Sequence, residues 1–197
     1  MQDLNILIVF CSHTGWTEKL ALAAAVGAVQ GRANIRLRHV RTPAEDGAVE
    51  SEPGWKEHRD RMNQEYIVPR ETDLEWADAV IAGTPARVGA ASGEWAEFLH
   101  LLEMAGSRGK LESKVATAFT GASPDGAENE STLGTLCAAM AKRGLTVVLP
   151  GELDSRDAFS EAAALQNVRL QARRVAEITR ALKRANCLKQ DSAAASS

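Results

Sequence analysis

The stretch from Asn5 to Thr17 limits what this chain can fold into more than any other segment. An apolar run from Ile6 to Phe10 stops abruptly at small and hydroxyl-bearing residues, and a proline-free segment rich in alanine follows from Glu18 to Val29. This order indicates a buried strand, a tight turn and the start of a helix. Because a helix N-terminus presents unpaired amides and the positive end of its dipole, it suits a phosphate group.

The turn carries hydroxyl groups but no Lys or Arg side chain. Ser12, Thr14 and Thr17 offer neutral donors, Gly15 allows close approach of the backbone, and no Lys or Arg lies between Cys11 and Thr17. The turn therefore predicts a phosphate site built from backbone amides and hydroxyls, with a hydroxyl-rich helix cap that binds no ligand as the alternative. Neither a Walker-type loop nor the Gly-x-Gly-x-x-Gly dinucleotide pattern occurs in the chain.

Length and charge exclude several classes of protein. With 197 residues and a formal net charge of −3, the chain is expected to form one domain and to bind neither nucleic acid nor an anionic membrane surface. No segment is long and apolar enough to span a bilayer and the N-terminus lacks a signal-peptide pattern, so we expect a cytoplasmic protein. Cys11, Cys137 and Cys187 form no Cys-x-x-Cys pair, which argues against a disulfide framework or a metal site. Cys11 and Cys137 are expected to be packing residues.

The remaining sequence alternates between strand-like and helix-like segments. Further strands are expected at Asn34–Val40, where alternation indicates an edge, and at Ala79–Gly83, Val115–Phe119 and Leu145–Leu149. Helices are expected at about Trp55–Gln64, Asp73–Asp78, from Ser92 onward, around Leu133–Met140 and at about Ala158–Ala185. We expect one domain over residues 1–187, with an irregular excursion at 41–70 held by Trp55, Met62 and Tyr66, and a disordered tail over 188–197.

Strands that alternate with helices predict an α/β protein with an open five-stranded parallel sheet. Three loops rich in Gly, Ser and Thr each leave the carboxyl end of a predicted strand: Cys11–Thr17, Gly83–Gly89 and Thr120–Gly126. Because ligands of such sheets bind beyond the carboxyl ends of the strands, the three loops are expected to converge on one ligand.

These motifs resemble the WrbA family of flavodoxin-like NAD(P)H:quinone oxidoreductases. The matching pieces are Ser12-His13-Thr14-Gly15, Gly83-Thr84-Pro85-Ala86-Arg87-Val88-Gly89 with Ser92-Gly93, Leu111-Glu112-Ser113-Lys114 leading to Thr120-Gly121-Ala122-Ser123, and the Gly144-to-Pro150 strand. The resemblance implies a flavodoxin-like three-layer sandwich with strand order 2-1-3-4-5. It also implies FMN as cofactor, NAD(P)H as electron donor, a quinone-like acceptor and a homo-oligomer, either a tetramer or a dimer.

The resemblance also assigns cofactor-binding residues. FMN phosphate would be cradled by Ser12, His13, Thr14, Gly15, Trp16 and Thr17. The flavin ring would be lined by the segment Thr84, Pro85, Ala86, Arg87, Val88 and Gly89, with Arg87 near its pyrimidine edge. Ribityl and ring would be covered from the other side by Thr120, Gly121, Ala122, Ser123 and Asp125. No catalytic side chain is expected because the flavin carries the chemistry. His13 is expected to be an exposed loop residue, with a hydrogen-bonding or ring-edge role as the alternative.

The chain departs from the family pattern on the substrate side. Where the family has a tyrosine, a histidine and a tryptophan that meet the nicotinamide or quinone, this chain has Thr14, Arg143 and about Gly106. Arg143 is a substrate-side candidate that would favour an anionic substrate, or else form a surface ion pair. The alternative functions are therefore a flavodoxin-type electron carrier and a degenerate interaction protein without turnover. A receiver-type signalling domain is disfavoured because Phe10-Cys11-Ser12 offers no acidic residue for Mg²⁺.

Overall fold

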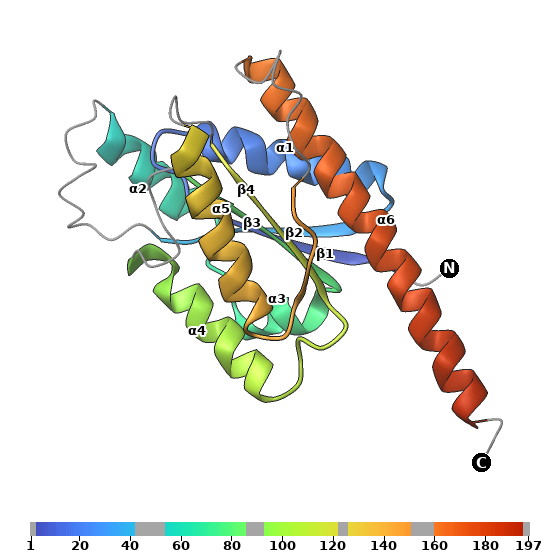
Figure 1. Ribbon diagram of the computed structural model, residues 1–197. Coiled ribbons are helices and arrows are strands. Elements are labelled where there is room, and N and C mark those ends of the chain that lie inside the picture. The colour runs from blue at the N-terminus through green and yellow to red at the C-terminus, as the bar shows by residue number, and fades with distance from the viewer. Residues whose placement is uncertain (1–2, 42–53, 86–92, 122–125, 151–159, 195–197) are drawn as a thin grey trace.

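Five parallel strands form the centre of the fold (Figure 1). The computed structural model describes residues 3–41, 54–85, 93–121, 126–150 and 160–194. The strands are β1 (Asn5–Phe10), β2 (Asn34–His39), β3 (Ala79–Thr84), β4 (Val115–Thr120) and β5 (Thr146–Val147), and they lie in the order β2-β1-β3-β4-β5. The predicted α/β class, parallel pairing and strand order are confirmed.

Helices cover both faces of the sheet. They are α1 (Trp16–Gln30), α2 (Trp55–Glu65), α3 (Glu71–Trp76), α4 (Gly93–Ser107), α5 (Gly126–Ala141) and α6 (Glu161–Ala194). One hydrophobic cluster joins the sheet to α1 and α6, and the other joins it to α3, α4 and α5. Neighbouring residues of β1 divide between the two, with Ile8 in the first and Val9 in the second, as expected of a strand covered on both sides. The result is a three-layer sandwich.

The edge position predicted for β2 is confirmed. Ile35 and Leu37 of this strand pack against the apolar cluster, while Arg36 and Arg38 turn outward and bind the Asp73 carboxylate of α3. The closest contact runs from the Arg38 guanidinium to Asp73 Oδ1 at 2.8 Å. Alternation in the sequence thus reports a strand with one apolar and one charged side.

Helices α1 and α6 pack unusually close together through two glycines. A Cβ atom added at Gly27 would lie 2.0 Å from the Arg169 carbonyl oxygen, and one at Gly31 would lie 2.6 Å from the Cβ of Ala176. Any side chain at these positions would push the helices apart. The C-terminal end of α1 is therefore fixed against the middle of α6.

The excursion contains the expected helix. Its observed bounds are Trp55–Glu65, and Trp55 and Met62 are buried. Tyr66 lies edge-on to Phe10 with ring centroids 5.1 Å apart. These anchors bring α2 to the carboxyl end of β1. Residues 42–53 of the excursion lie outside the described residues.

Two expected boundaries differ from the structure. Strand β5 spans only Thr146–Val147 instead of Leu145–Leu149, because it pairs with the first two residues of β4 alone and Pro150 has no N–H to extend a ladder. Helix α6 continues to Ala194 through most of the segment expected to be a disordered tail. Neither Pro nor Gly follows Leu182, and alanine favours the helix, so nothing in the sequence ends it earlier. None of the helices in the described ranges is long and apolar enough to cross a membrane.

Candidate functional site

The loops predicted to share a ligand begin side by side at the carboxyl edge of the sheet. Backbone hydrogen bonds connect them there: Cys11 donates to the Gly83 carbonyl at 2.9 Å, and Gly121 donates to the Thr84 carbonyl at 3.2 Å. The described parts of all three loops therefore meet, as the parallel topology requires.

The first loop forms a cap over the start of α1. The buried Ser12 hydroxyl accepts hydrogen bonds from the amides of Gly15 at 3.2 Å and Glu18 at 3.3 Å. Gly15 adopts a φ of 88°, in the left-handed region that glycine enters without strain. Within the described part of the chain, the amides of Trp16 and Thr17 have no acceptor. These first-turn amides remain available for an anion.

Other residues of the first loop reach toward its neighbours. A Cβ at Gly121 would lie 2.7 Å from Trp16 Cδ1, so the first and third loops touch through the indole. Thr14 is exposed and Thr17 is buried. His13, expected to be exposed, is only 8% exposed, because its ring packs with Nε2 3.7 Å from Cys11 Sγ.

The second and third loops are described only at their beginnings. Thr84 is fully buried, and its hydroxyl accepts a hydrogen bond from the Trp95 indole of α4 at 3.2 Å. The Thr120 hydroxyl donates to the Gly121 carbonyl at 3.3 Å. Thr84 therefore fixes α4 against the carboxyl end of β3. The predicted residues Ala86, Arg87, Val88, Gly89, Ala122, Ser123 and Asp125, and the expected helix cap Ser92, lie outside the described residues.

A charged cluster from the excursion lies directly beside the first loop. His58 of α2 faces Gly15, where a Cβ would lie 2.8 Å from the imidazole Cε1. Glu18, in the first turn of α1, accepts hydrogen bonds from Arg61 at 2.6 and 3.2 Å and from the Tyr66 hydroxyl at 2.8 Å. The nearest His58 nitrogen is 4.0 Å from the same carboxylate. The cluster has only one sign in the sequence, which is an acidic residue, Glu18, close enough to the predicted phosphate loop to require a cation from another segment.

Burial and hydrogen bonding set the charges in this cluster. Burial alone would raise the pKa of the Glu18 carboxyl, but hydrogen bonds from Arg61 and Tyr66 outweigh it and hold that pKa below its usual value. Burial, helped by the Arg61 charge, lowers the pKa of His58. At neutral pH Glu18 is therefore ionised and His58 is neutral. The Arg61 guanidinium offsets the Glu18 charge, which would otherwise oppose an anion at the helix start.

Arg143 lies at the amino end of the strands, whereas these loops leave the carboxyl end. Its guanidinium donates to the carbonyls of Leu99 at 3.1 Å and Ala139 at 2.9 Å and lies 3.5 Å from Glu103. A Cβ at Gly106 would lie 2.6 Å from the Arg143 carbonyl. Arg143 directly precedes β5 at the amino end of β4, and a six-residue strand is roughly 17 Å long. Within one chain, Arg143 and Gly106 thus come together but remain apart from Thr14.

The sequence pattern of the family described as NADPH-dependent FMN reductase matches residues 4–153. The chain belongs to this family. An NAD(P)H dehydrogenase (quinone) from Deinococcus radiodurans is 33% identical over 153 residues, covering 77% of this chain and 75% of the relative. Another protein of that name, from Archaeoglobus fulgidus, is 30% identical over 189 residues, or 90% of this chain and 98% of the relative.

Solved structures support the fold. A WrbA-like flavodoxin from Agrobacterium tumefaciens superposes with a TM-score of 0.60 at 24% identity, covering 90% of this chain and 98% of that one. A flavodoxin from the domain Archaea gives a TM-score of 0.56 at 15% identity, over 90% of this chain and 99% of the other. The flavodoxin-like fold and the resemblance to the WrbA-like proteins are confirmed.

The described residues of the reductase site fit FMN, the cofactor of this family. The phosphate would meet the amides of Trp16 and Thr17 at the positive end of α1, and the left-handed Gly15 lets the loop turn into the helix without strain. Ser12 fixes the shape of the loop, because its hydroxyl accepts hydrogen bonds from the amides of Gly15 and Glu18. The loop itself offers no Lys or Arg for this purpose, so the phosphate site remains a prediction based on amides and hydroxyl groups.

Proposed function

We propose that this protein is an FMN-dependent oxidoreductase that passes electrons from NAD(P)H to a quinone-like acceptor. The observation that carries the proposal is the loop at the start of α1, where Ser12 accepts hydrogen bonds from two amides and those of Trp16 and Thr17 have no acceptor in the described ranges. Family membership and the quinone-dehydrogenase names of the relatives support the assignment of donor and acceptor.

When bound, FMN supplies the hydride and electron transfer that the reaction needs. The chain binds and orients it. Ser12 to Thr17 would hold the phosphate, and Trp16 against Gly121 closes the wall between the first and third loops. The ring contacts of Ala86, Arg87, Val88 and Gly89 remain part of the proposal, as do those of Ala122, Ser123 and Asp125.

We further propose that the working form is a cytoplasmic homo-oligomer, a tetramer or dimer, in which a second copy brings Arg143 to the substrate side. The support is geometric, because in its own chain Arg143 lies at the amino end of the strands and the FMN loop lies at the carboxyl end. Arg143→Ala should lower kcat/KM for an anionic quinone about tenfold, as expected for loss of one charged hydrogen bond, and leave FMN affinity unchanged. Arg108→Ala, which removes an exposed charge bound to Glu71, is the matched control.

The experiment that tests the activity is NAD(P)H oxidation by the FMN-loaded protein. Turnover should require FMN, proceed with NADH or NADPH, and accelerate when 1,4-benzoquinone is added. FMN-loaded protein that oxidises neither nucleotide would instead be an electron carrier of the flavodoxin type. Protein that binds no FMN would be the interaction module, and the proposal would be wrong.

A further inference from the structure

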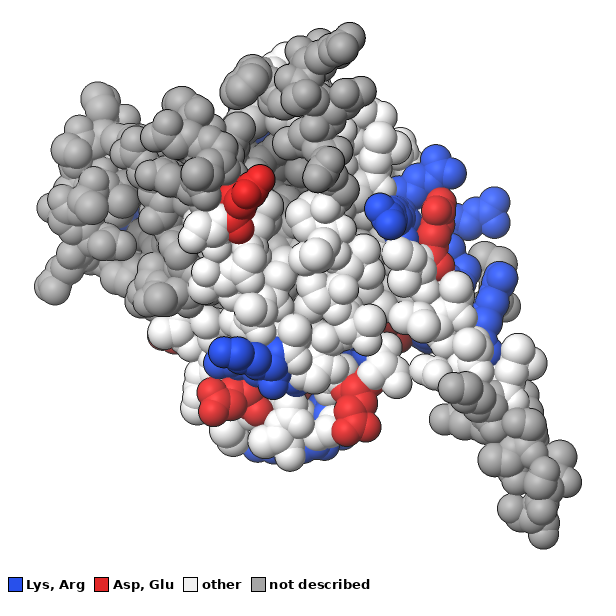
Figure 2. All heavy atoms as spheres, in the orientation of Figure 1, with Lys and Arg blue, Asp and Glu red and all other residues white. Residues whose placement is uncertain are grey.

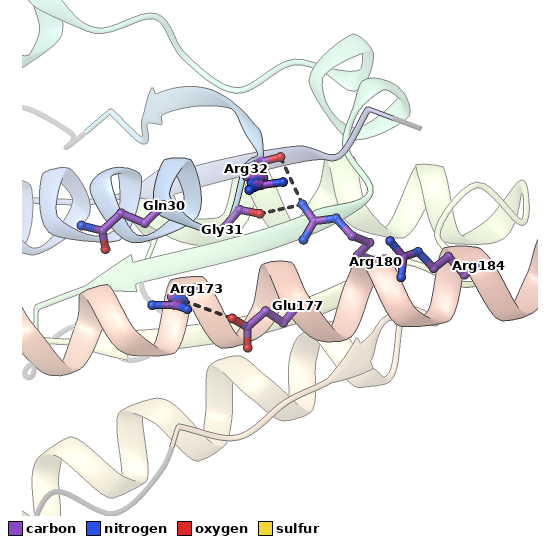
Figure 3. A pocket seen from close by; sticks show the side chains of 7 residues that line it. All are labelled: Gln30, Gly31, Arg32, Arg173, Glu177, Arg180 and Arg184. Carbon is purple, nitrogen blue, oxygen red and sulfur yellow. Dashed lines mark hydrogen bonds and ion pairs between the residues drawn. The ribbon is translucent and has the colours of Figure 1, made fainter. Parts of the chain in front are cut away.

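A hollow lies between the C-terminal end of α1 and the middle of α6, remote from the flavin loop. Its volume is about 260 Å³, and Figure 3 shows the residues that line it: Gln30, Gly31, Arg32, Arg173, Glu177, Arg180 and Arg184. Four of these carry a positive charge and one a negative charge. Figure 2 shows basic side chains gathered on this side of the molecule, although the whole chain has a net charge of −3. The positive charge is therefore local.

One arginine compensates for the helix end itself. A helix C-terminus exposes carbonyl oxygens and the negative end of the dipole, which repel anions. Arg180 donates from one nitrogen to the carbonyls of Gly31 at 2.6 Å and Arg32 at 3.1 Å. Since Gly31 packs against Ala176, this wall of the hollow is held in place. The remaining arginines are not needed for the cap.

The guanidinium groups of these remaining arginines have N–H donors that no strong ion pair uses among the described residues. Arg173 pairs with Glu177 at 3.1 Å, but both side chains are more than half exposed, so the pair is weak. For Arg32 and Arg184, no ion-pair partner exists within the described ranges. Arg180 and Arg184 are four residues apart and therefore lie on the same face of α6, one turn from each other, whereas Arg173 lies about 16 Å from Arg184 along the helix axis.

Arg32 occupies a backbone position where glycine is favoured. Its φ is 58°, in the left-handed region that follows many helix ends, and a side chain there adds steric strain. The chain nevertheless has an arginine at this place, and it lines the hollow beside Arg180 (Figure 3). A bound anion would make use of that side chain.

We propose that this hollow binds a compact phosphate-bearing anion through Arg32 and Arg184. Guanidinium groups bind phosphate oxygens through paired N–H donors, which makes arginine the usual choice for such ligands. The volume lies below the usual range of about 300–1,000 Å³ for small-molecule sites, so a diphosphate suits it better than a whole dinucleotide. Helix α1 has 15 residues and is about 22 Å long, which separates the site from the FMN phosphate at the other end.

Titration of the intact chain with pyrophosphate at low ionic strength tests the proposal, by calorimetry and by NMR of the arginine side chains. The wild type should bind one pyrophosphate per chain, with added salt weakening the complex. Arg184→Ala and Arg32→Gly should each weaken it about three- to tenfold, allowing for partly exposed charged hydrogen bonds. Arg32→Gly also relieves the left-handed strain, so its loss of binding cannot be ascribed to unfolding.

Arg174→Ala is the matched control, because Arg174 is an exposed arginine of the same helix that does not line the hollow. It should change pyrophosphate affinity less than twofold, and none of these variants should alter FMN affinity. A wild type that binds no pyrophosphate at millimolar concentration would overturn the proposal. An equal loss in Arg174→Ala, or binding of only an RNA oligonucleotide or anionic vesicles, would overturn it as well, since the charge would then act diffusely or serve a macromolecule.

Discussion

Helix α1 begins at a loop of amides and hydroxyl groups, and it ends among arginine side chains. At its start, Cys11–Thr17 contains no Lys or Arg, and Ser12 and Gly15 shape a turn in which the amides of Trp16 and Thr17 have no acceptor among the described residues. At its end, Arg180 caps the carbonyls and further guanidinium groups face an open hollow. We thus propose two anion sites on one helix, one built from backbone amides and hydroxyl groups and the other from guanidinium groups.

The difference follows from the direction of the helix dipole. The positive end of α1 attracts a phosphate by itself. The negative charge of the nearby Glu18 carboxylate opposes that attraction, and Arg61 offsets the charge. The negative end repels anions, so side chains must first cap it and then supply all of the positive charge. Salt should therefore weaken the exposed arginine site more than the buried amide site, because exposed charges are screened more strongly.

Gly15→Val should have the largest effect at the amide end. The substitution places a branched side chain at a φ of 88°, with its Cβ 2.8 Å from the His58 ring. We expect the free energy of unfolding to fall by about 2 kcal/mol and FMN affinity to fall about a hundredfold. Urea unfolding and quenching of flavin fluorescence measure the two changes.

Gly134→Ala provides the control for that substitution. Gly134 lies in α5, and among the described residues no atom comes within 4 Å of the Cβ that alanine would add. Alanine should therefore stabilise the helix by about 0.5–1 kcal/mol. Its FMN affinity should match the wild type. If Gly15→Val binds FMN normally, the loop at the start of α1 is not the phosphate site.

Arg61→Ala should have an intermediate effect, because it leaves the Glu18 carboxylate without its main partner beside the phosphate. FMN affinity should fall about tenfold and the free energy of unfolding by about 1 kcal/mol, since the Arg61 side chain is 39% exposed. The double variant Glu18→Gln/Arg61→Ala should recover most of the affinity because the repelling charge is gone. A double variant that binds no better than Arg61→Ala would show that Arg61 acts by another route.

The smallest effect is expected from His58→Gln, and it depends on pH. The folded-state pKa of His58 lies below its ordinary 6.5, so the unfolded chain binds more protons and stability falls as pH decreases from about 6.5. His58→Gln should remove this slope, which is at most about 1.4 kcal/mol per pH unit. Urea unfolding from about pH 8 to about pH 5 measures it.

His100→Gln, at an exposed position of α4, is the control and should keep the slope of the wild type. Glu18 behaves differently from His58, because its stabilisation is present above its ordinary pKa of 4.5 and is lost as pH falls through the lower folded-state pKa. This second loss should persist in His58→Gln when the unfolding series is continued to about pH 3. An unchanged slope near pH 6.5 would mean that His58 is not the group that titrates.

Much of the fold could be predicted because periodicity reports burial. The continuous run Ile6–Phe10 became a buried strand, the alternating Asn34–Val40 became an edge, and the apolar positions of α4 and α5 became core. Boundaries were less certain. The length of β5 depends on how far its neighbour pairs with it, and no local residue encodes that.

The site could be predicted only where its residues are contiguous. Ser12 to Thr17 form one motif, whereas His58, Arg61 and Tyr66 come from a segment without a regular period. Their contact with Glu18 depends on where α2 docks, through Met62 and Tyr66 on the sheet. Arg143 illustrates the same limit, because its position in the family motif does not indicate at which end of the strands it lies.

Titration of the purified protein with FMN, followed by flavin absorbance and fluorescence, tests the central claim most directly. The account predicts one FMN per chain at micromolar affinity or tighter, with the affinity retained in Arg184→Ala and lost in Gly15→Val. Absence of flavin binding at micromolar concentration, or equal binding by Gly15→Val, would contradict it.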